Sequence, residues 1–416
     1  MKNRISDILS LSGVQGVNLI LPLVVIPFLI LKLGIDGYGR YAFAFAFANY
    51  LSLIVDFGYN LSNVQRISVV SECLVSKSKI FCSTVISKVF IFGISTAIFI
   101  PLLLLTDIFR FYQEIAVVYV IVLSNIFNPI YFFQAIGRIK IYSFINLSSR
   151  IITIPILFIF VREQGDILVA LGVMSSSYLI VSVFSLYYLF RTKQLTVIVV
   201  SRSEIVRGLK YSWPVFLSNS SIGIYTQLMV IFLGVHTSPV AVGIYSFLTK
   251  LSSSVYAIFF YPISQIYLPV VSKAFKASYD QGLNYLGILQ KRVITYMGII
   301  VGFYFFLGRY LLVFLGPEMA TAKVEFYLRI LAFVPFFMAF GASYGLLGLL
   351  AIGSKLSIKM FRDSYLIAGI VALLVGAILI TCYGLDGAVC AIVSVEIIVA
   401  LSLFLKFRLY KKTIKS

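Results

Sequence analysis

The chain has 416 residues, of which 61% are hydrophobic and 12% are charged, and its mean hydropathy is +1.03. Soluble globular proteins have about 45–50% apolar and about 25% charged residues, so this composition excludes a soluble globular protein. The 34 Lys and Arg residues outnumber the 15 Asp and Glu residues, which gives a net charge of +19. Most of these cations must lie outside the bilayer if the chain is a membrane protein.

Metal and nucleic-acid chemistry have little support in the sequence. The chain has one histidine and four cysteines, without a CxxC pair, whereas zinc sites need about three or four such ligands together. The basic residues are spread between apolar runs and do not form a basic polar domain. We therefore expect no metal, no cofactor and no nucleic-acid partner.

Twelve apolar segments are long enough to span a membrane as helices, which need about 20 residues each. They lie near residues 9–31, 38–57, 82–105, 115–136, 141–161, 166–190, 211–234, 240–270, 293–315, 326–352, 364–383 and 385–407. The sequence therefore predicts an all-α integral membrane protein with twelve transmembrane helices.

The distribution of basic residues predicts the orientation of these helices. The loops on one side of the predicted bundle hold 24 of the 34 basic residues and those on the other side hold seven. Because cytoplasmic loops carry an excess of Lys and Arg, we expect both termini in the cytoplasm. The remaining three cations, Lys88, Arg150 and Lys250, lie inside predicted spans.

A short motif recurs in the two halves of the chain. Gly39, Tyr41 and Phe43 open the second span, and Gly243, Tyr245 and Phe247 open the eighth with the same spacing. A Leu-Gly pair closes the preceding span in each half. We therefore predict two six-helix lobes, residues 1–200 and 201–416. Parallel repeats of this kind are one way to build a transporter with its site between the halves.

Two cations lie near the middle of predicted spans. At about 1.5 Å per residue, Arg150 is roughly 14 Å and Lys250 roughly 15 Å from the nearest span end. A charge at that depth costs at least about 2.5–3.5 kcal/mol, so it normally faces water or a partner. Tyr142 and Asn146 share the helix face of Arg150. We predict a cationic cavity; a structural ion pair inside the bundle is the alternative.

Three further cations are candidates with a simpler alternative each. Lys88 is about 9 Å inside its span, so its side chain could line the cavity or extend to the cytoplasmic headgroups. Arg66 and Lys210 lie at cytoplasmic ends of spans. Membrane orientation alone would explain these two.

Several segments, in order along the whole chain, are similar to the O-antigen and polysaccharide flippases of the multidrug/oligosaccharidyl-lipid/polysaccharide exporter superfamily. They are Gly37-Tyr38-Gly39-Arg40-Tyr41, Asp56-Phe57-Gly58-Tyr59-Asn60, Arg66-Ile67-Ser68, Tyr131–Arg138, Asn146–Arg150, Trp213-Pro214, Val242–Tyr245 and Tyr261–Gln265. The family often has Thr where this chain has Gln65.

The resemblance implies two lobes in a V around a central cavity. It implies a transporter, without enzymatic activity, that moves an undecaprenyl-pyrophosphate-linked oligosaccharide across the bacterial inner membrane to the periplasmic leaflet by alternating access. Arg150 and Lys250 would hold the anion, and Arg66, Lys88 and Lys210 would guide it. Membrane lipids, the polysaccharide polymerase and the chain-length machinery are the other partners that the resemblance implies.

Coupling to a proton or sodium gradient requires a carboxylate that both sides can reach. Asp56 and Glu396 are the acids at or inside the cytoplasmic half of the predicted bundle. Asp56 could instead cap a helix end. Two other functions stay open, a small-molecule or multidrug exporter of the same superfamily and a membrane-embedded glycan polymerase. The first favours a more acidic or aromatic cavity, and the second needs a larger external loop or catalytic acid–base groups.

Overall fold

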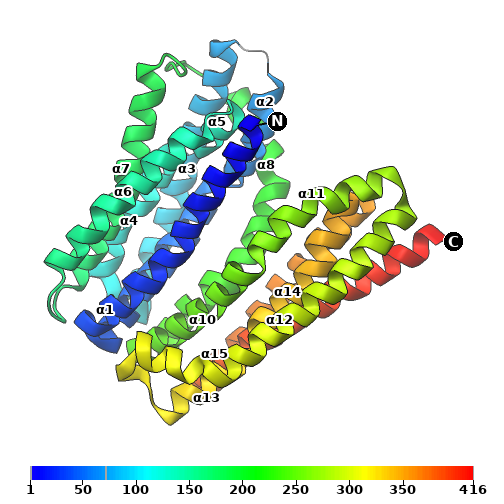
Figure 1. The fold of residues 1–416 in the computed structure, drawn as a ribbon. Helices are drawn as coiled ribbons and strands as arrows, with labels where there is room; N and C mark the ends of the chain where they lie inside the picture. The colour runs from blue at the N-terminus through cyan, green and yellow to red at the C-terminus, as the bar shows by residue number, and fades with distance from the viewer. Residues whose placement is uncertain (1, 71–72, 416) are drawn as a thin grey trace. The chain divides into compact units, whose positions relative to one another are not determined.

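The computed structural model describes the backbone of residues 2–70 and 73–415 and most side chains from residue 21 onward (Figure 1). All regular elements of this described part are helical. In chain order they are α1 (Lys2–Asp56), α2 (Tyr59–Val69), α3 (Leu74–Leu105), η1 (Asp107–Phe111), α4 (Tyr112–Phe127), α5 (Ile130–Ala135), α6 (Ile139–Phe160), α7 (Ile167–Arg191), α8 (Arg202–Gly223), η2 (Ile224–Leu228), α9 (Met229–His236), α10 (Pro239–Phe259), α11 (Tyr261–Ala277), α12 (Tyr279–Leu315), η3 (Pro317–Met319), α13 (Ala322–Leu331), α14 (Val334–Tyr344), η4 (Gly345–Leu350) and α15 (Lys355–Lys415).

Nine helical stretches in the described residues are long and apolar enough to cross a membrane. Two stretches contain a break between predicted spans, because α1 leaves helical geometry at Gly34 and α15 does so at Gly384. Helix α8, the π-helical turn η2 and α9 together cover the predicted seventh span. The observed helices therefore fit the twelve predicted spans.

The chain divides into two compact units, Met1–Gly223 and Ile224–Ser416. The predicted lobes met at residue 200, which assigned α8 to the second lobe. In the structure α8 packs against α1, α2 and α3 of the first unit. The division of the compact units therefore lies at η2, within the predicted seventh span.

In the first unit, α4 packs against both α1 and α7, and α6 also packs against α7 (Figure 1). A cluster of buried hydrophobic residues joins α2, α3, α5, α6 and α7, and its aromatic members are Phe81, Tyr131, Phe132, Phe133 and Tyr142. Apolar side chains on the outer faces stay exposed, as Phe144 is 70% exposed. Such a surface is stable where lipid, not water, surrounds it.

In the second unit, α12, α14 and α15 pack together around a second cluster of buried residues, which includes Leu286, Met297 and Leu403. The motif that recurs in the sequence has the same burial in both units. Tyr41 and Tyr245 are both buried, as are Phe43 and Phe247.

A sharp break between α1 and α2 fixes the position of the charged residues described below. Phe57 and Gly58 both have positive φ, 49° and 76°. The second value belongs to the left-handed region, which costs other residues about 1–2 kcal/mol. A Cβ on Gly58 would also lie 2.8 Å from the backbone nitrogen of Phe216 in α8. Position 58 therefore requires glycine.

We expect Gly58→Ala to destabilise the first unit by at least about 1–2 kcal/mol, because the backbone strain adds to the clash with α8. Gly93→Ala is the matched control, since a Cβ there meets no atom within 4 Å and replacing a helical glycine gains about 0.5–1 kcal/mol. Thermal unfolding of the purified protein can be followed by fluorescence of Trp213, the single tryptophan, whose ring lies 5.8 Å from that of Phe57. Equal melting temperatures for the two variants would contradict this explanation.

Candidate functional site

Lys88 and Asp56 form a buried ion pair inside the first unit. The Nζ atom of Lys88 lies 2.9 Å from Oδ1 of Asp56, and the Lys88 side chain is 0% exposed. The same Nζ donates to the backbone oxygen of Asn125 at 3.2 Å and lies 5.8 Å from the ring centroid of Tyr131. Lys88 therefore does not extend to the headgroups, and that alternative for it was wrong.

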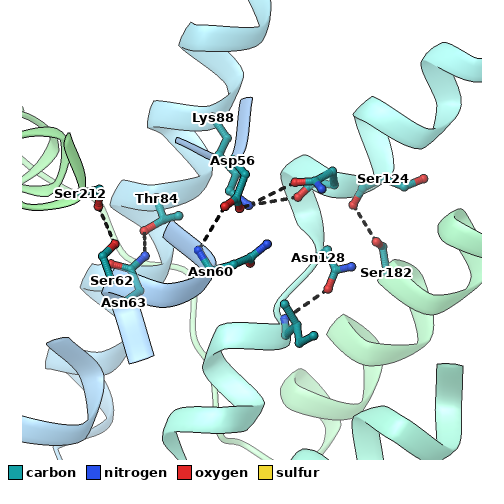
Figure 2. A network of polar contacts seen from close by, with 12 residues as sticks. Asp56, Asn60, Ser62, Asn63, Thr84, Lys88, Ser124, Asn128, Ser182 and Ser212 are labelled. Carbon is teal, nitrogen blue, oxygen red and sulfur yellow. Dashed lines mark hydrogen bonds and ion pairs between the residues drawn. The ribbon is translucent and has the colours of Figure 1, made fainter. Parts of the chain in front are cut away.

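Asp56 also caps the helix that follows the break. Its Oδ2 accepts a hydrogen bond from the backbone N–H of Asn60, in the first turn of α2, at 3.3 Å (Figure 2). The N–H groups of a first helical turn have no partner within the helix, so the carboxylate satisfies one of them. Asp56 thus joins α1, α2 and α3, and its predicted alternative role as a cap is confirmed.

Arg66 belongs to a second polar chain, within the next two turns of α2. Its Nη1 donates to Oδ1 of Asn63 at 2.9 Å, and Nδ2 of Asn63 donates to Oγ1 of Thr84 in α3 at 2.7 Å. The guanidinium carbon lies 5.7 Å from the ring centroid of Tyr211 in α8. The hydroxyls of Ser62 and Ser212 meet at 2.6 Å on the same side (Figure 2). Arg66 is half-buried and is held by neutral partners.

Arg150 has a different environment on α6. Its side chain is half-buried, and its Nε donates to Oδ1 of Asn146 at 3.1 Å. Within the described residues no carboxylate lies within 4 Å of this guanidinium, and its two Nη groups have no hydrogen-bond acceptor. Within the described part of the chain, no acid therefore compensates the charge of Arg150.

Tyr142 and Asn146 lie on the same face of α6 as Arg150, as predicted, and have different partners. The hydroxyl of Tyr142 accepts a hydrogen bond from Nδ2 of Asn128 at 3.0 Å, and the ring is buried. Asn146 turns its amide oxygen to Arg150. Tyr142 is therefore part of the packed core, while Asn146 orients the guanidinium.

The other two predicted cations are exposed. Lys250 lies on α10 in the second unit, and Lys210 lies on α8 in the first. The backbone oxygen of Lys250 accepts hydrogen bonds from the hydroxyls of Ser253 and Ser254. The sequence-predicted residues thus divide between the two units, and their role in substrate binding stays a prediction.

Glu396 is a buried carboxylate in the second unit. It is 5% exposed on α15 and interacts electrostatically with Tyr245, Tyr256 and Tyr365. Among the residues that the structure describes, no Lys or Arg nitrogen lies within 4 Å of it. Asp56, in contrast, has Lys88 as a cationic partner.

Sequence reasoning missed Asn63 and Asn125, which hold Arg66 and Lys88. Asn60, Asn63 and Arg66 are spaced by three residues and share a helix face, so the sequence held a signal for Asn63. Asn125 carries no such signal, because its contact with Lys88 joins two separate helices.

The chain matches the family described as "Polysaccharide biosynthesis protein" over residues 5–275. It belongs to this family. The "Putative O-antigen transporter" of Escherichia coli strain K12 is 28% identical over 407 residues, which cover 96% of this chain and 95% of that protein. The predicted membership of the polysaccharide flippase family is therefore confirmed.

Solved structures of transporters share the fold. The lipid II flippase MurJ in an inward closed conformation has a TM-score of 0.75 at 17% identity, over 98% of this chain and 88% of that one. An inward-facing multidrug resistance MATE transporter of the MOP superfamily has a TM-score of 0.67 at 16% identity, over 95% and 98%. The all-α transporter fold is confirmed, and the named relative is a transporter, not an enzyme.

We expect the Lys88–Asp56 pair to stabilise the first unit only as a pair. Lys88→Met leaves a buried, uncompensated carboxylate and should cost about 3–5 kcal/mol of unfolding free energy. The double variant Asp56→Asn, Lys88→Met removes both charges and should recover most of that loss. Denaturant unfolding of the purified wild type, the two single variants and the double variant gives the four unfolding free energies of this double-mutant cycle.

Arg362→Met is the control for this cycle, because the Arg362–Asp363 pair is partly exposed and should contribute no more than about 1 kcal/mol. If the double variant is as unstable as the sum of the two single variants, the two side chains do not act as a pair.

Proposed function

We propose that the protein is a flippase for an O-antigen or related polysaccharide repeat unit linked to undecaprenyl pyrophosphate. It moves this lipid from the cytoplasmic to the periplasmic leaflet of the bacterial inner membrane by alternating access, with both of its termini in the cytoplasm. The family membership and the O-antigen transporter of E. coli support the substrate class. The 24-to-7 distribution of basic loop residues supports the orientation.

The observation that carries this proposal is the state of Arg150. Its one described side-chain partner, Asn146, is neutral, so the guanidinium keeps its full positive charge. Arginine binds phosphate through two parallel hydrogen bonds, and the two Nη groups of Arg150 have the geometry for this. A cation at this depth in a membrane protein marks a pathway for an anion or a polar substrate.

Besides Arg150, other cations would contact the substrate along its path across the membrane. Arg66, in the last turn of α2, and Lys210, on α8, would attract the pyrophosphate, while Lys250 would bind it in the second unit. Because Asp56 neutralises Lys88, we propose that Lys88 does not bind the substrate itself and instead holds the surrounding helices in place.

We propose that transport is coupled to protons or sodium through Glu396 instead of Asp56. A buried carboxylate without a cation can gain a proton or bind a small cation at moderate cost, whereas a carboxylate paired with Lys88 must first break that pair. The three tyrosines near Glu396 are neutral hydrogen-bonding groups that tolerate either state.

We expect Arg150→Ala to lower transport at least about tenfold, since a hydrogen bond to a charged group contributes about 1.5–3 kcal/mol. Arg150→Lys should retain more activity than Arg150→Ala because it keeps the charge. The measurement is surface polysaccharide in cells that lack their own flippase, together with lipid-linked oligosaccharide accumulated in the inner membrane.

A sharper test places a carboxylate beside the arginine. Asn146→Asp is nearly isosteric and would neutralise Arg150 without removing it, so transport should fall while thermal stability stays equal or rises. Arg162→Ala is the matched control, because that arginine lies in an exposed connection after α6 and should be dispensable. Full transport by Asn146→Asp, at normal protein levels, would rule out Arg150 as the anion site.

We expect Glu396→Gln to remove the ion response of the transporter. In inside-out membrane vesicles supplied with lipid-linked oligosaccharide, wild-type protein should show substrate-dependent proton or sodium movement, and the Gln variant should not. Glu163→Gln, in an exposed loop, controls for the loss of one acid. An unchanged ion response in Glu396→Gln would exclude this coupling residue.

The same cells distinguish the two other functions. A multidrug exporter would change drug resistance and leave surface polysaccharide absent. A polymerase would let single repeat units reach the surface and would change only their polymerisation.

A further inference from the structure

An apolar groove lies in the second unit, between α12 and the region where α13 meets α14. Its volume is about 340 Å³, within the range of about 300–1,000 Å³ that is typical of ligand pockets. The residues that line it are Gly298, Val301, Gly302, Phe305, Phe306, Phe333 and Phe336. This lining has almost no polar surface, so the groove suits a hydrocarbon chain and not water.

Two glycines create the floor of this groove. Gly298 and Gly302 are one turn apart on α12 and therefore share a helix face. A Cβ on Gly302 would meet no atom within 4 Å, and one on Gly298 would meet only Phe336, at 3.8 Å. The phenylalanines form the walls, and Phe306 is 76% exposed, so the groove is open on the outer face of the unit.

A cationic cluster lies at one end of the groove. Arg329 on α13 contacts the groove directly, with its guanidinium carbon 5.8 Å from the ring centroid of Phe305. Nη2 of Arg329 lies 2.7 Å from Oε1 of Glu325, and Nε of Arg309 lies 3.8 Å from Oε2 of the same carboxylate. Two arginines share one acid, which leaves the cluster with a net charge of +1.

The far end of the groove lies about one bilayer leaflet away from the cluster. Gly298 and Arg309 are separated along α12 by about 16 Å at 1.5 Å per residue. Half of a hydrocarbon core of about 30 Å is about 15 Å. Tyr310, next to Arg309, is 70% exposed, as is usual for tyrosine at a membrane interface.

We infer that this groove and cluster bind one anionic glycerophospholipid, with an acyl chain between α12 and α14 and its phosphate at Arg309 and Arg329. The apolar floor fits the chain, and the net charge of +1 complements a singly charged headgroup such as phosphatidylglycerol. Basic pockets between transmembrane helices recognise anionic lipid headgroups in this manner. The inference does not depend on the proposed transport substrate.

Photolabelling of the purified full-length protein tests this site. The probe is phosphatidylglycerol with a diazirine at the end of one acyl chain, and labelled peptides identify the contact. We expect labelling around residues 298–306 and 333–336. Unlabelled phosphatidylglycerol should compete, whereas phosphatidylcholine with the same acyl chains should compete weakly.

Variants separate the groove from the cluster. Gly302→Leu fills the groove and should abolish labelling there, and Gly287→Leu is the matched control, because position 287 on the same helix is also open and lies outside the groove. Arg309→Gln and Arg329→Gln should each weaken binding about fivefold, which corresponds to about 1 kcal/mol per basic residue. Lys323→Gln controls for charge on α13, since Lys323 pairs with Asp386.

Three results would overturn the inference. Equal competition by phosphatidylcholine would show that the arginines do not select the headgroup. Unchanged labelling of Gly302→Leu would show that the chain lies elsewhere. Stronger competition by a polyprenyl phosphate than by phosphatidylglycerol would assign the groove to an isoprenoid tail instead of a phospholipid.

Discussion

A charge inside a bilayer has no water to solvate it, and the first unit is organised around satisfying one such charge. Lys88 is fully buried and is surrounded by Asp56, the backbone and side chain of Asn125, and the ring of Tyr131. Each of these partners comes from a different element: α1, α4 and α5. The ammonium group of Lys88 thus connects α3 with these three elements.

The position of Asp56 depends in turn on the backbone. Helix α1 ends at this residue, and the two following residues have positive φ, so the chain changes direction before α2 begins. The new direction brings Ser62 to a polar partner in α8, Asn63 to one in α3, and Arg66 to the ring of Tyr211 in α8. A continuous helix would place these side chains at other rotations and depths. The break and the ion pair are therefore two parts of one arrangement.

The spans were predictable from the sequence because each depends on local composition alone. The breaks at Gly34 and Gly384 lie between predicted spans, because the limits of each span also follow from local composition. The partner of Lys88 was not predictable, because helical spacing shows which residues share a face and not which faces meet. The depth of Lys88 was consistent with a side chain that extends to the headgroups; the direction of its side chain came only from packing. The contact between Ser62 and Ser212 joins positions 150 residues apart and has no local signal.

Arg150 and Lys88 show two outcomes of the same constraint. A carboxylate partner cancels the charge of Lys88, so the pair has little attraction left for an anion. An amide partner orients Arg150 and leaves its charge intact. A charge at mid-membrane depth without an acid costs about 2.5–3.5 kcal/mol or more. The amide of Asn146 therefore leaves in place a positive charge that a carboxylate at the same position would cancel.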